Sequence, residues 1–491
     1  MKNPNSNYIS SLVSKYKGLS IVAKASLWFV FATVLQKGVS FLTVPIFTRI
    51  MTTDQYGLYN AYLSLASILT IICGLEFQSC IYINNLSKLN DNKEKEKLAV
   101  SLINLTFIIT SIWFIIYLVA KDFWNRIFGV TSSMMYLMFL EAYFVPVVNF
   151  WVTKQRFNYK YKALVIWSVL QVILNAVFGI IFVLIVDNNQ QASARVFSIA
   201  LVQCVFGSIL IVSYCKKAGT IFYNVWWKKA LLLHIPLLPH SLSLTILSSA
   251  DRLMINHMIG PTETALYGVA YSASMVINLI KLSVVNALTP WIYECIKEKK
   301  YDEIEKRSRI CIIIVMMMSF TFILFAPELI LIVGGKKYYS AIYVVPPVAV
   351  SVFFTFLYNL FSIIQFYYEK TKEIMMASLS AAFINLILNV IFINIFGYVA
   401  AAYTTLICYI LLSVAHYIFM RKTIKTHDIK SEVFDMNFIL LMSIVVLASM
   451  VGFSFLYKFI IVRYCMIALL IILMILKRKV LLSALNKPRR G

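Results

Sequence analysis

The stretch ALVIWSVLQVILNAVFGIIFVLIV, from Ala163 to Val186, is long and apolar enough to cross a lipid bilayer as one helix. An α-helix rises about 1.5 Å per residue and the hydrocarbon core is about 30 Å thick, so a span needs about 20 residues. No water pairs with the backbone inside the bilayer, so such a segment has to be helical. Similar segments recur along the chain, whose 491 residues are 61% hydrophobic and 13% charged. The sequence therefore predicts an all-α polytopic membrane protein.

Fourteen segments of this kind are present, and we expect each to form a transmembrane helix. They cover residues 21–47, 59–83, 98–120, 133–152, 163–186, 195–215, 231–256, 264–290, 310–333, 342–366, 375–396, 398–419, 437–457 and 460–477. The longest polar connections have about fifteen residues, near the upper end of ordinary loop lengths. No connection is long enough to fold as a catalytic domain, and no G-x-x-x-x-G-K-[ST] motif occurs. We therefore expect a protein that is not an enzyme and that does not hydrolyse ATP.

Lysine and arginine are distributed unevenly between the two sides of the predicted bundle. If the N-terminus is inside, the loops on that side and both tails carry 33 of the 45 basic residues, and the opposite loops carry eight. Cytoplasmic loops are enriched in Lys and Arg, so both termini are expected in the cytoplasm. The net charge of +24 follows from this orientation, and no nucleic-acid partner is expected. Met1–Lys17 is polar and no A-x-A site follows the first span, so that span is expected to direct insertion.

The cysteines and histidines do not show the spacing of a metal site. The eight cysteines lie in spans or at their cytoplasmic ends, none of them in a C-x-x-C pair, and the five histidines are scattered. We expect the cysteines to be packing residues, and we expect no cofactor and no metal.

An internal repeat relates the fifth span to the eleventh. The motif ILNAVF at Ile173–Phe178 recurs as ILNVIF at Ile387–Phe392, and the same offset aligns Gln171 with Asn385 and Asn175 with Asn389. This match predicts two six-helix lobes, residues 1–219 and 220–425, followed by two helices and a cytoplasmic tail in residues 426–491. With an even number of helices per lobe, the lobes are related by a pseudo-two-fold axis along the membrane normal, an arrangement found in transporters.

Three spans carry polar side chains at the spacing of one helix face. Such faces are unfavourable against lipid, so they are expected to line a cavity or to form hydrogen bonds between helices. The seventh span has His234, Ser241, Thr245, Ser248 and Arg252; the eighth has Tyr267, Tyr271, Ser274, Asn278 and Lys281; the tenth has Ser351, Thr355, Tyr358, Ser362 and Gln365.

Ionisable residues inside the spans are candidates for function because each is unfavourable in the bilayer. Lys37, Glu76, Glu141 and Lys281 lie near mid-depth, and Lys24, Arg49, Asp251 and Arg252 lie nearer the ends. Ion pairs of Lys37 with Glu76 or Glu141 are an alternative explanation, and Lys24 and Arg49 are long enough to reach the membrane surface. Asp251 and Arg252 point about 100° apart on a helix and are expected to have separate partners. The excess of cations favours an anionic cargo, with phosphate as the natural group.

Four stretches resemble the O-antigen/capsule (Wzx-type) polysaccharide flippases of the MOP exporter superfamily, which are related to the MATE exporters. They are VPIFTRIMTTDQYGLY (Val44–Tyr59), PLLPHSLSLTILSSADRLMI (Pro236–Ile255), ALYGVAY (Ala265–Tyr271) and INLILNVIFINIFGYVAAA (Ile384–Ala402). The resemblance extends over nearly the whole chain in the same order. One departure is Asn394, where the family often has proline.

The resemblance implies two six-helix lobes that alternate between inward- and outward-open states in a bacterial inner membrane. It also implies a cargo, undecaprenyl-diphosphate-linked oligosaccharide, that is moved to the periplasmic leaflet for surface polysaccharide synthesis, with a polymerase and a chain-length regulator as further partners. On this basis we expect a gradient of H⁺ or Na⁺ to drive transport. The candidate residues are Lys37, Arg49, Arg252 and Lys281 for diphosphate or acidic sugar, Ser241, Thr245, Ser248, Tyr271, Asn278, Tyr358, Asn385 and Asn389 for sugars or the cavity wall, and Glu76, Glu141 and Asp251 for ion coupling or gating.

Three other functions remain as alternatives. A MATE-like antiporter of organic cations would use a membrane acid, but the excess of cations counts against it. A membrane-embedded glycan polymerase or ligase would need a large extracytoplasmic loop, which the sequence lacks. A peptidoglycan-precursor flippase of the same superfamily is poorly separated from a polysaccharide flippase by sequence.

Overall fold

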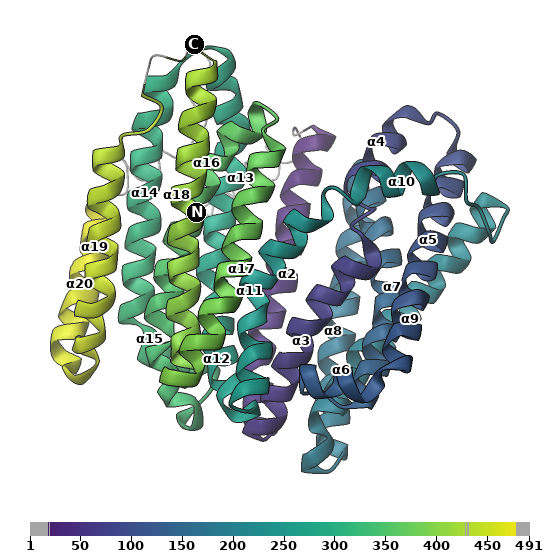
Figure 1. The fold of residues 1–491 in the computed structure, drawn as a ribbon, viewed down its shortest axis with the longest axis horizontal. Coiled ribbons are helices and arrows are strands. Elements are labelled where there is room, and N and C mark those ends of the chain that lie inside the picture. Colours follow the sequence, from purple (N-terminus) through teal and green to yellow (C-terminus); the bar gives the residue numbers. More distant parts are fainter. Residues whose placement is uncertain (1–17, 19, 428, 430–431, 478–491) are drawn as a thin grey trace, which may run out of the picture. The chain divides into compact units, whose positions relative to one another are not determined.

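The structure is a computed structural model that describes residue 18, residues 20–427, residue 429 and residues 432–477 (Figure 1). Every regular element in these residues is helical. Twelve helices are long and apolar enough to span a membrane, and a bent pair of helices makes a thirteenth candidate. The predicted all-α polytopic fold is therefore confirmed. The last predicted span corresponds to a shorter apolar helix, α20 (Ile460–Leu476).

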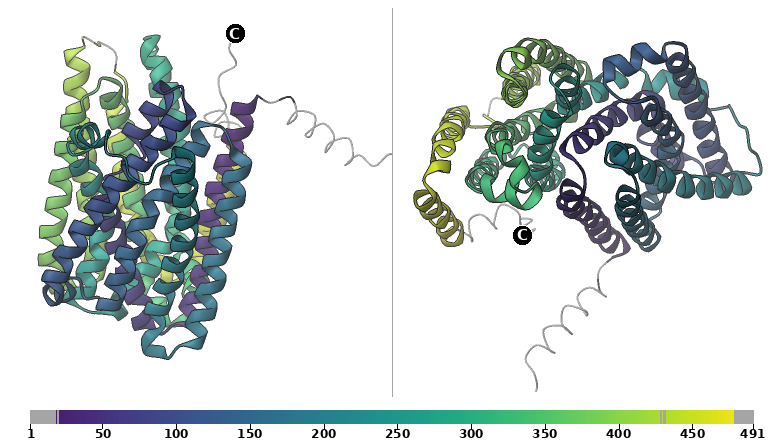
Figure 2. Two further views of the ribbon diagram at one scale, coloured as in Figure 1. Left: turned by 90° about the vertical axis from the view of Figure 1, so that its right-hand side faces the viewer. Right: turned by 90° about the horizontal axis from the view of Figure 1, so that it is seen from below.

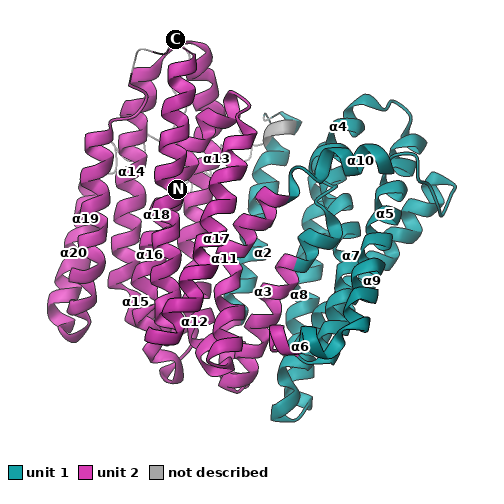
Figure 3. Ribbon diagram, viewed as in Figure 1, with its two compact units in different colours: residues 1–43, 69–125, 131–238 teal, residues 44–68, 126–130, 239–491 magenta. Residues whose placement is uncertain are grey.

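The described helices form two compact units (Figure 3). Unit 1 comprises residues 1–43, 69–125 and 131–238, and unit 2 comprises residues 44–68, 126–130 and 239–491. Helices α2 (Ile21–Ile50), α3 (Thr53–Gly74) and α6 (Lys121–Phe128) contribute residues to both units. The units are defined by compactness, whereas the predicted lobes 1–219, 220–425 and 426–491 are defined by the internal repeat, and that division stays a prediction.

Unit 1 is built around helices that pack on α9. Its further elements are α4 (Cys80–Lys88), α5 (Asn92–Val119), α6 (Lys121–Phe128), α7 (Ser132–Phe157), α8 (Tyr161–Ile185), η1 (Asn188–Gln190), α9 (Gln191–Ala218) and α10 (Trp227–His234). Helices α5, α7 and α8 all contact α9, and the short α10 packs on α4 and α5. Apolar side chains such as Phe77, Leu102 and Phe150 form the core between them.

Unit 2 is built around α16, a predominantly apolar helix that is buried on nearly all sides, including its polar face. The unit contains α11 (Leu238–Met258), α12 (Pro261–Ala273), α13 (Met275–Lys297), α14 (Tyr301–Leu324), α15 (Ala326–Val333), η2 (Lys336–Tyr343), α16 (Val345–Tyr367), α17 (Thr371–Phe396), α18 (Val399–Thr426), α19 (Met436–Phe455), η3 (Leu456–Lys458) and α20. Helices α13, α14 and α18 pack on α16, and 83% of the apolar window of α16 is buried.

Other helices leave most of their apolar surface exposed, as expected for helices that face lipid. Only 17% of the apolar window of α8 and of α19 is buried. On α8 the exposed side chains include Ile166, Leu184 and Ile185. Within each unit the axes of the long helices are roughly aligned, and consecutive long helices joined by a short turn run in opposite directions (Figure 2). Aligned helices with apolar faces exposed to lipid suit a bilayer, because each helix satisfies its own backbone hydrogen bonds.

Four predicted spans are interrupted, and here the expectation of single helices was wrong. The span 59–83 is broken after Gly74, where Leu75 and Glu76 adopt positive φ angles of 45° and 50°. The span 231–256 is divided into α10 and α11, bent by 55°, in a segment that contains Pro236. Proline lacks the N–H of an interior helical residue and its ring clashes with the preceding turn.

The other two interruptions are milder. The span 264–290 is divided into α12 and α13 at Ser274, whose hydroxyl donates to the Ala270 carbonyl. The span 310–333 is divided into α14 and α15 at Phe325, just before Pro327 in the first turn of α15. A proline is favourable in the first turn of a helix and unfavourable in its interior, so the new helix begins there.

Candidate functional site

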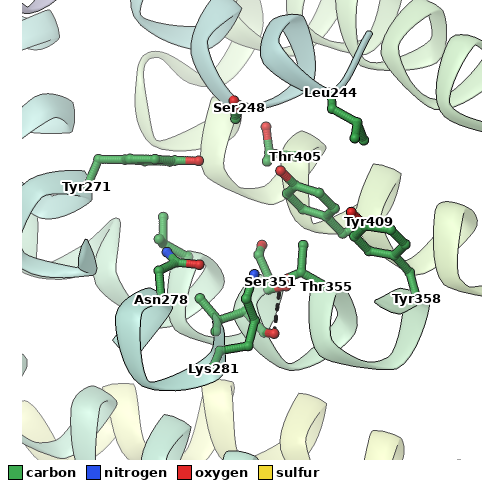
Figure 4. Close-up of a pocket in the computed structure, with 12 residues that line it drawn as sticks. Leu244, Ser248, Tyr271, Asn278, Lys281, Ser351, Thr355, Tyr358, Thr405 and Tyr409 are labelled. Atoms are coloured by element: carbon green, nitrogen blue, oxygen red, sulfur yellow. Dashed lines mark hydrogen bonds between the residues drawn. The ribbon is translucent and has the colours of Figure 1, made fainter. Parts of the chain in front are cut away.

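A polar cavity of about 290 Å³ lies inside unit 2 (Figure 4). Its wall is formed by side chains of α11, α12, α13, α16 and α18. The lining residues are Leu244, Ser248, Tyr271, Asn278, Lys281, Val348, Ser351, Val352, Thr355, Tyr358, Thr405 and Tyr409. Parts of all three polar faces predicted from the sequence therefore meet around one space.

Lys281 is the only charged side chain among the described residues that line this cavity. It lies on α13, one turn after Asn278, so both side chains reach the wall from the same helix face. No carboxylate within the described residues forms an ion pair with Lys281. An ammonium group in a cavity among membrane helices without an opposite charge favours the binding of an anion.

Three tyrosines contribute the aromatic part of the wall. Tyr358 and Tyr409 lie on one side of the cavity in Figure 4, and Tyr271 approaches from the opposite side with its hydroxyl directed inward. The hydroxyls of Ser248, Ser351, Thr355 and Thr405 belong to the same lining. Rings and hydroxyl groups together provide flat apolar faces beside hydrogen-bonding groups, the combination that amphipathic ligands require.

A buried carboxylate lies behind this wall. Asp251 on α11 is 1% exposed. Its Oδ2 accepts hydrogen bonds from the Tyr267 hydroxyl (2.5 Å) and the Thr405 hydroxyl (2.7 Å), and its Oδ1 accepts from Asn389 Nδ2 (2.7 Å). Asn389 Nδ2 also donates to Asn385 Oδ1, at 3.2 Å. Hydrogen bonds to both oxygens stabilise the ionised carboxylate.

Thr405 connects the carboxylate to the cavity. Its hydroxyl donates to Asp251, accepts from Asn385 Nδ2 (3.1 Å) and belongs to a residue of the cavity lining. Thr404, the preceding residue on α18, donates to Asn389 Oδ1. Movement of α18 would therefore change both the cavity wall and the hydrogen bonds of the buried carboxylate.

Arg252 has partners of its own, as the helix geometry predicted. Its Nη2 donates to the Ser248 carbonyl at 3.3 Å, and its guanidinium carbon lies 5.0 Å from the centre of the Tyr271 ring. Its buried Nε has no hydrogen-bond partner among the described residues. Arg252 therefore stacks behind a tyrosine of the cavity wall, while the neighbouring Asp251 contacts α12, α17 and α18.

The two halves of the internal repeat use their amide pairs differently. In unit 2, Asn389 donates to a carboxylate. In unit 1, the aligned Asn175 accepts through Oδ1 from Nη1 of the buried Arg195 at 2.7 Å, and Gln171 donates to Gln203 at 2.8 Å. The amides face the following helix in both units, but an acid lies at the polar centre of unit 2 and a guanidinium at that of unit 1.

The remaining predicted residues lie outside the cavity lining. Arg49, at the end of α2, donates to the carbonyls of Pro45 (2.7 Å) and Ile332 (3.1 Å), so it joins α2 to α15 within unit 2. Ser241 and Thr245 lie on α11. Exposed Lys37, together with Glu76 after α3 and Glu141 on α7, belongs to unit 1.

The expectation that His234 extends the polar face of the seventh span was wrong. The bend between α10 and α11 separates it from Ser248, and its Nε2 accepts a hydrogen bond from the Ile81 backbone at 3.2 Å within unit 1. Conversely, sequence reasoning missed Thr404, Thr405 and Tyr409 on α18. Their spacing places Thr405 and Tyr409 one turn apart, but a single pair is too short a pattern to stand out.

Solved structures share this fold. The lipid II flippase MurJ in an inward closed conformation matches 92% of this chain and 99% of its own, with a TM-score of 0.68 and 15% identity. An inward-facing multidrug resistance MATE family transporter of the MOP superfamily matches 81% of this chain and 100% of its own, with a TM-score of 0.59 and 15% identity. An outward-facing MATE structure has a TM-score of 0.51, 15% identity and coverages of 84% and 97%.

One curated relative matches a shorter stretch of the sequence. An uncharacterized membrane protein of Haemophilus influenzae is 25% identical over 138 residues. This alignment covers 28% of the present chain and 34% of the relative, so the chain spans about a third of the length of that protein.

Two family models match the chain. The model described as MatE matches residues 236–391, which include α11 and most of the cavity wall. The model described as polysaccharide biosynthesis protein matches residues 22–296, more than half of the chain. With the shared fold, these matches confirm the predicted resemblance to the MOP superfamily. The chain belongs to the polysaccharide biosynthesis protein family.

Proposed function

We propose that this protein flips undecaprenyl-diphosphate-linked oligosaccharide from the cytoplasmic to the periplasmic leaflet of a bacterial inner membrane. The product serves the synthesis of a surface polysaccharide such as O-antigen, capsule or exopolysaccharide. The observation that carries the proposal is a polar, lysine-bearing cavity within a unit of membrane helices, in a chain of the polysaccharide biosynthesis family. A sugar headgroup on a diphosphate does not cross hydrocarbon unaided, since each charged or unpaired polar group is costly there.

The chemistry of the cavity suits such a cargo. Lys281 supplies a positive charge, and the hydroxyl and amide groups of Ser248, Asn278 and Tyr358 supply hydrogen bonds for sugar hydroxyls. The prenyl tail would remain in lipid. In this proposal Lys37, Arg49 and Arg252 are further candidates for contact with the anionic part of the cargo.

Coupling to an ion gradient is assigned to Asp251. Binding of H⁺ would neutralise the carboxylate and weaken its hydrogen bonds with Asn389, Tyr267 and Thr405. Na⁺ would compete for the same oxygens, because carboxylate, amide and hydroxyl oxygens are ligands of hard cations. Because Thr405 also lines the cavity, either event would alter the cavity wall. Glu76 and Glu141 are secondary candidates for this role.

The proposed orientation places both termini and the lysine-rich loops in the cytoplasm. A polymerase and a chain-length regulator are the expected partners, because the flipped unit has to be assembled into a longer glycan on the far side.

Deletion of the gene tests this function. We expect loss of the surface glycan together with accumulation of the completed lipid-linked unit, measured by mass spectrometry of membrane extracts. A plasmid with the wild-type gene should restore the glycan, and so should Lys297→Gln, which removes an exposed charge from the same helix as Lys281. Normal glycan without accumulation, in a strain that lacks a second flippase, would contradict the proposal.

Charge variants of the cavity test the binding step. A hydrogen bond to a charged group contributes about 1.5–3 kcal/mol, so Lys281→Ala is expected to slow flipping about 10- to 100-fold. If Lys281→Ala and Arg252→Ala both flip at the wild-type rate, a cationic cavity has no role in transport.

A second candidate function is a cation-coupled antiporter of organic cations, favoured by the MatE match over residues 236–391. The one charge among the described residues of the cavity wall is positive, which disfavours a cationic cargo. Susceptibility of the deletion strain to cationic dyes and drugs distinguishes the two: increased susceptibility with unchanged surface glycan would support the antiporter.

A further inference from the structure

The polar cavity of unit 2 is distinctive because it combines one positive charge with three aromatic rings. Lys281 is the only charged lining residue among those described, and the same cavity has Tyr271 on one side and Tyr358 and Tyr409 on the other (Figure 4). We infer that this cavity is a subsite for one sugar residue with a single carboxylate, such as a hexuronate, and that it does not hold the diphosphate. The inference rests on the proposed flippase function and specifies which part of the cargo enters this site.

The size of the cavity favours a single sugar residue. Pockets for drug-sized ligands have volumes of about 300–1,000 Å³, and the 290 Å³ found here is at the lower limit of that range. A whole oligosaccharide repeat unit is too large for this space. One ring therefore enters the cavity while the rest of the glycan extends beyond it.

The charge of the cavity favours one negative charge. Asp251 lies behind Thr405, and Arg252 lies behind Tyr271. The opposite charges of these two adjacent residues therefore offset each other behind the wall of the cavity. Within the part of the chain that the structure describes, Lys281 alone brings a charge to the cavity surface. A carboxylate would match one ammonium group, whereas a diphosphate carries at least two charges and is better bound by several cations or by forked arginine contacts. An unmatched charge inside a membrane protein is costly.

The uncharged part of the wall favours a sugar ring over a simple carboxylic acid. Tyr358 and Tyr409 offer aromatic faces to the C–H groups of a ring, and the hydroxyls of Ser248, Thr355 and Tyr271 are positioned around the same space. A sugar hydroxyl both donates and accepts, as do the serine, threonine and tyrosine hydroxyls. The Ser248 and Thr355 hydroxyls donate to carbonyls of their own helices, so their oxygens can accept from a sugar hydroxyl, a donor that an aliphatic acid does not supply.

Binding to the purified full-length protein in detergent tests the inference. The probes are D-glucuronate, D-glucose and inorganic pyrophosphate, each titrated by isothermal calorimetry and by saturation-transfer NMR. We expect glucuronate to bind about 10- to 100-fold more tightly than glucose, the ratio that one charge-assisted hydrogen bond supplies. Pyrophosphate is expected to compete poorly with glucuronate.

Variants assign the preference to the cavity. Lys281→Gln should reduce the ratio of glucuronate to glucose affinity to about one, Lys281→Arg should preserve most of it, and Lys297→Gln on the same helix should leave it unchanged. Thermal unfolding of each variant shows whether it is folded. If Lys281→Gln is unstable, Lys281→Arg still tests the role of the positive charge, because it keeps that charge. Tyr358→Ala should weaken the binding of glucose and of glucuronate to a similar extent, because contact with the aromatic ring does not depend on the carboxylate.

Several results would overturn the inference. Equal affinities of the wild type for glucose and glucuronate would show that the carboxylate of the sugar does not contribute to binding. If pyrophosphate binds more tightly than glucuronate and this binding depends on Lys281, the site would be assigned to the diphosphate instead. Absence of sugar binding at tens of millimolar would exclude a sugar subsite. None of these outcomes contradicts flipping itself, which depends on accumulation of the lipid-linked unit in the deletion strain.

Discussion

The hydrogen-bonded carboxylate of Asp251 gives the most direct test of the packing of unit 2. Replacing Asp251 with alanine removes the acceptor of three side-chain donors, on Tyr267, Thr405 and Asn389, which lie on three other helices. All three side chains are buried, so water does not readily replace the lost partner. Side-chain hydrogen bonds within membrane proteins average about 0.6 kcal/mol and reach about 1.7, so three are expected to contribute about 2–5 kcal/mol.

The assay is reversible unfolding of the purified protein in mixed detergent micelles, followed by far-UV circular dichroism. Tyr267→Phe removes one donor and keeps the ring, so we expect a loss of about 1 kcal/mol in the free energy of unfolding, against about 2–5 kcal/mol for Asp251→Ala. Asp302→Asn is the matched control. Asp302 is an exposed carboxylate in the first turn of α14, where a charge contributes at most about 1 kcal/mol. If the Asp251→Ala and Asp302→Asn variants have the same free energy of unfolding, the hydrogen bonds of Asp251 do not stabilise unit 2.

Three further changes probe other parts of the structure. Gly57→Ala should destabilise the protein by about 1–3 kcal/mol or more, because a Cβ there would lie 1.7 Å from a backbone oxygen of α12, whereas Gly452→Ala, in open space on α19, should be neutral or stabilising; thermal unfolding of the pair measures the difference. Arg463→Ala should cost about 1–3 kcal/mol because it leaves the partly buried Glu328 carboxylate without its ion pair, and the double variant with Glu328→Ala should recover part of the loss in unfolding experiments. The variant Lys299→Cys, in a chain without its native cysteines, should react with an impermeant maleimide only when the cytoplasmic side of the membrane is accessible. Labelling of this cysteine in intact spheroplasts would contradict the proposed orientation.

The transmembrane segments could be predicted because hydrophobicity along the chain reports directly on the solvent of each segment. The run from Ala163 to Val186 forms α8 almost to the residue, and its largely exposed apolar surface agrees with lipid contact. The breaks within the predicted spans were harder to predict from the sequence. A run such as 59–83 is predominantly apolar in spite of Glu76 and Gln78, and the positive φ angles at Leu75 and Glu76 lie where the chain turns toward α4.

The candidate site was predictable in its parts but not as a whole. Helical spacing placed Tyr271, Asn278 and Lys281 on one face, although α12 and α13 meet between them. The same reasoning placed His234 on a face that the bend before α11 removes. Thr405 carried no signal of its own, since a threonine in an apolar helix usually bonds to its own backbone.

The sequence by itself determined the class of molecule, the number and approximate limits of its apolar segments and the excess of cations within them, because these properties depend on composition and on the period of a helix. Only the tertiary structure decided which polar faces share a cavity, that Asp251 accepts from three helices while Arg252 stacks on Tyr271, and that Lys281 is the charge that the cavity receives. Helical periodicity specifies a direction around one helix axis, whereas the neighbour that a side chain meets depends on how several helices pack together.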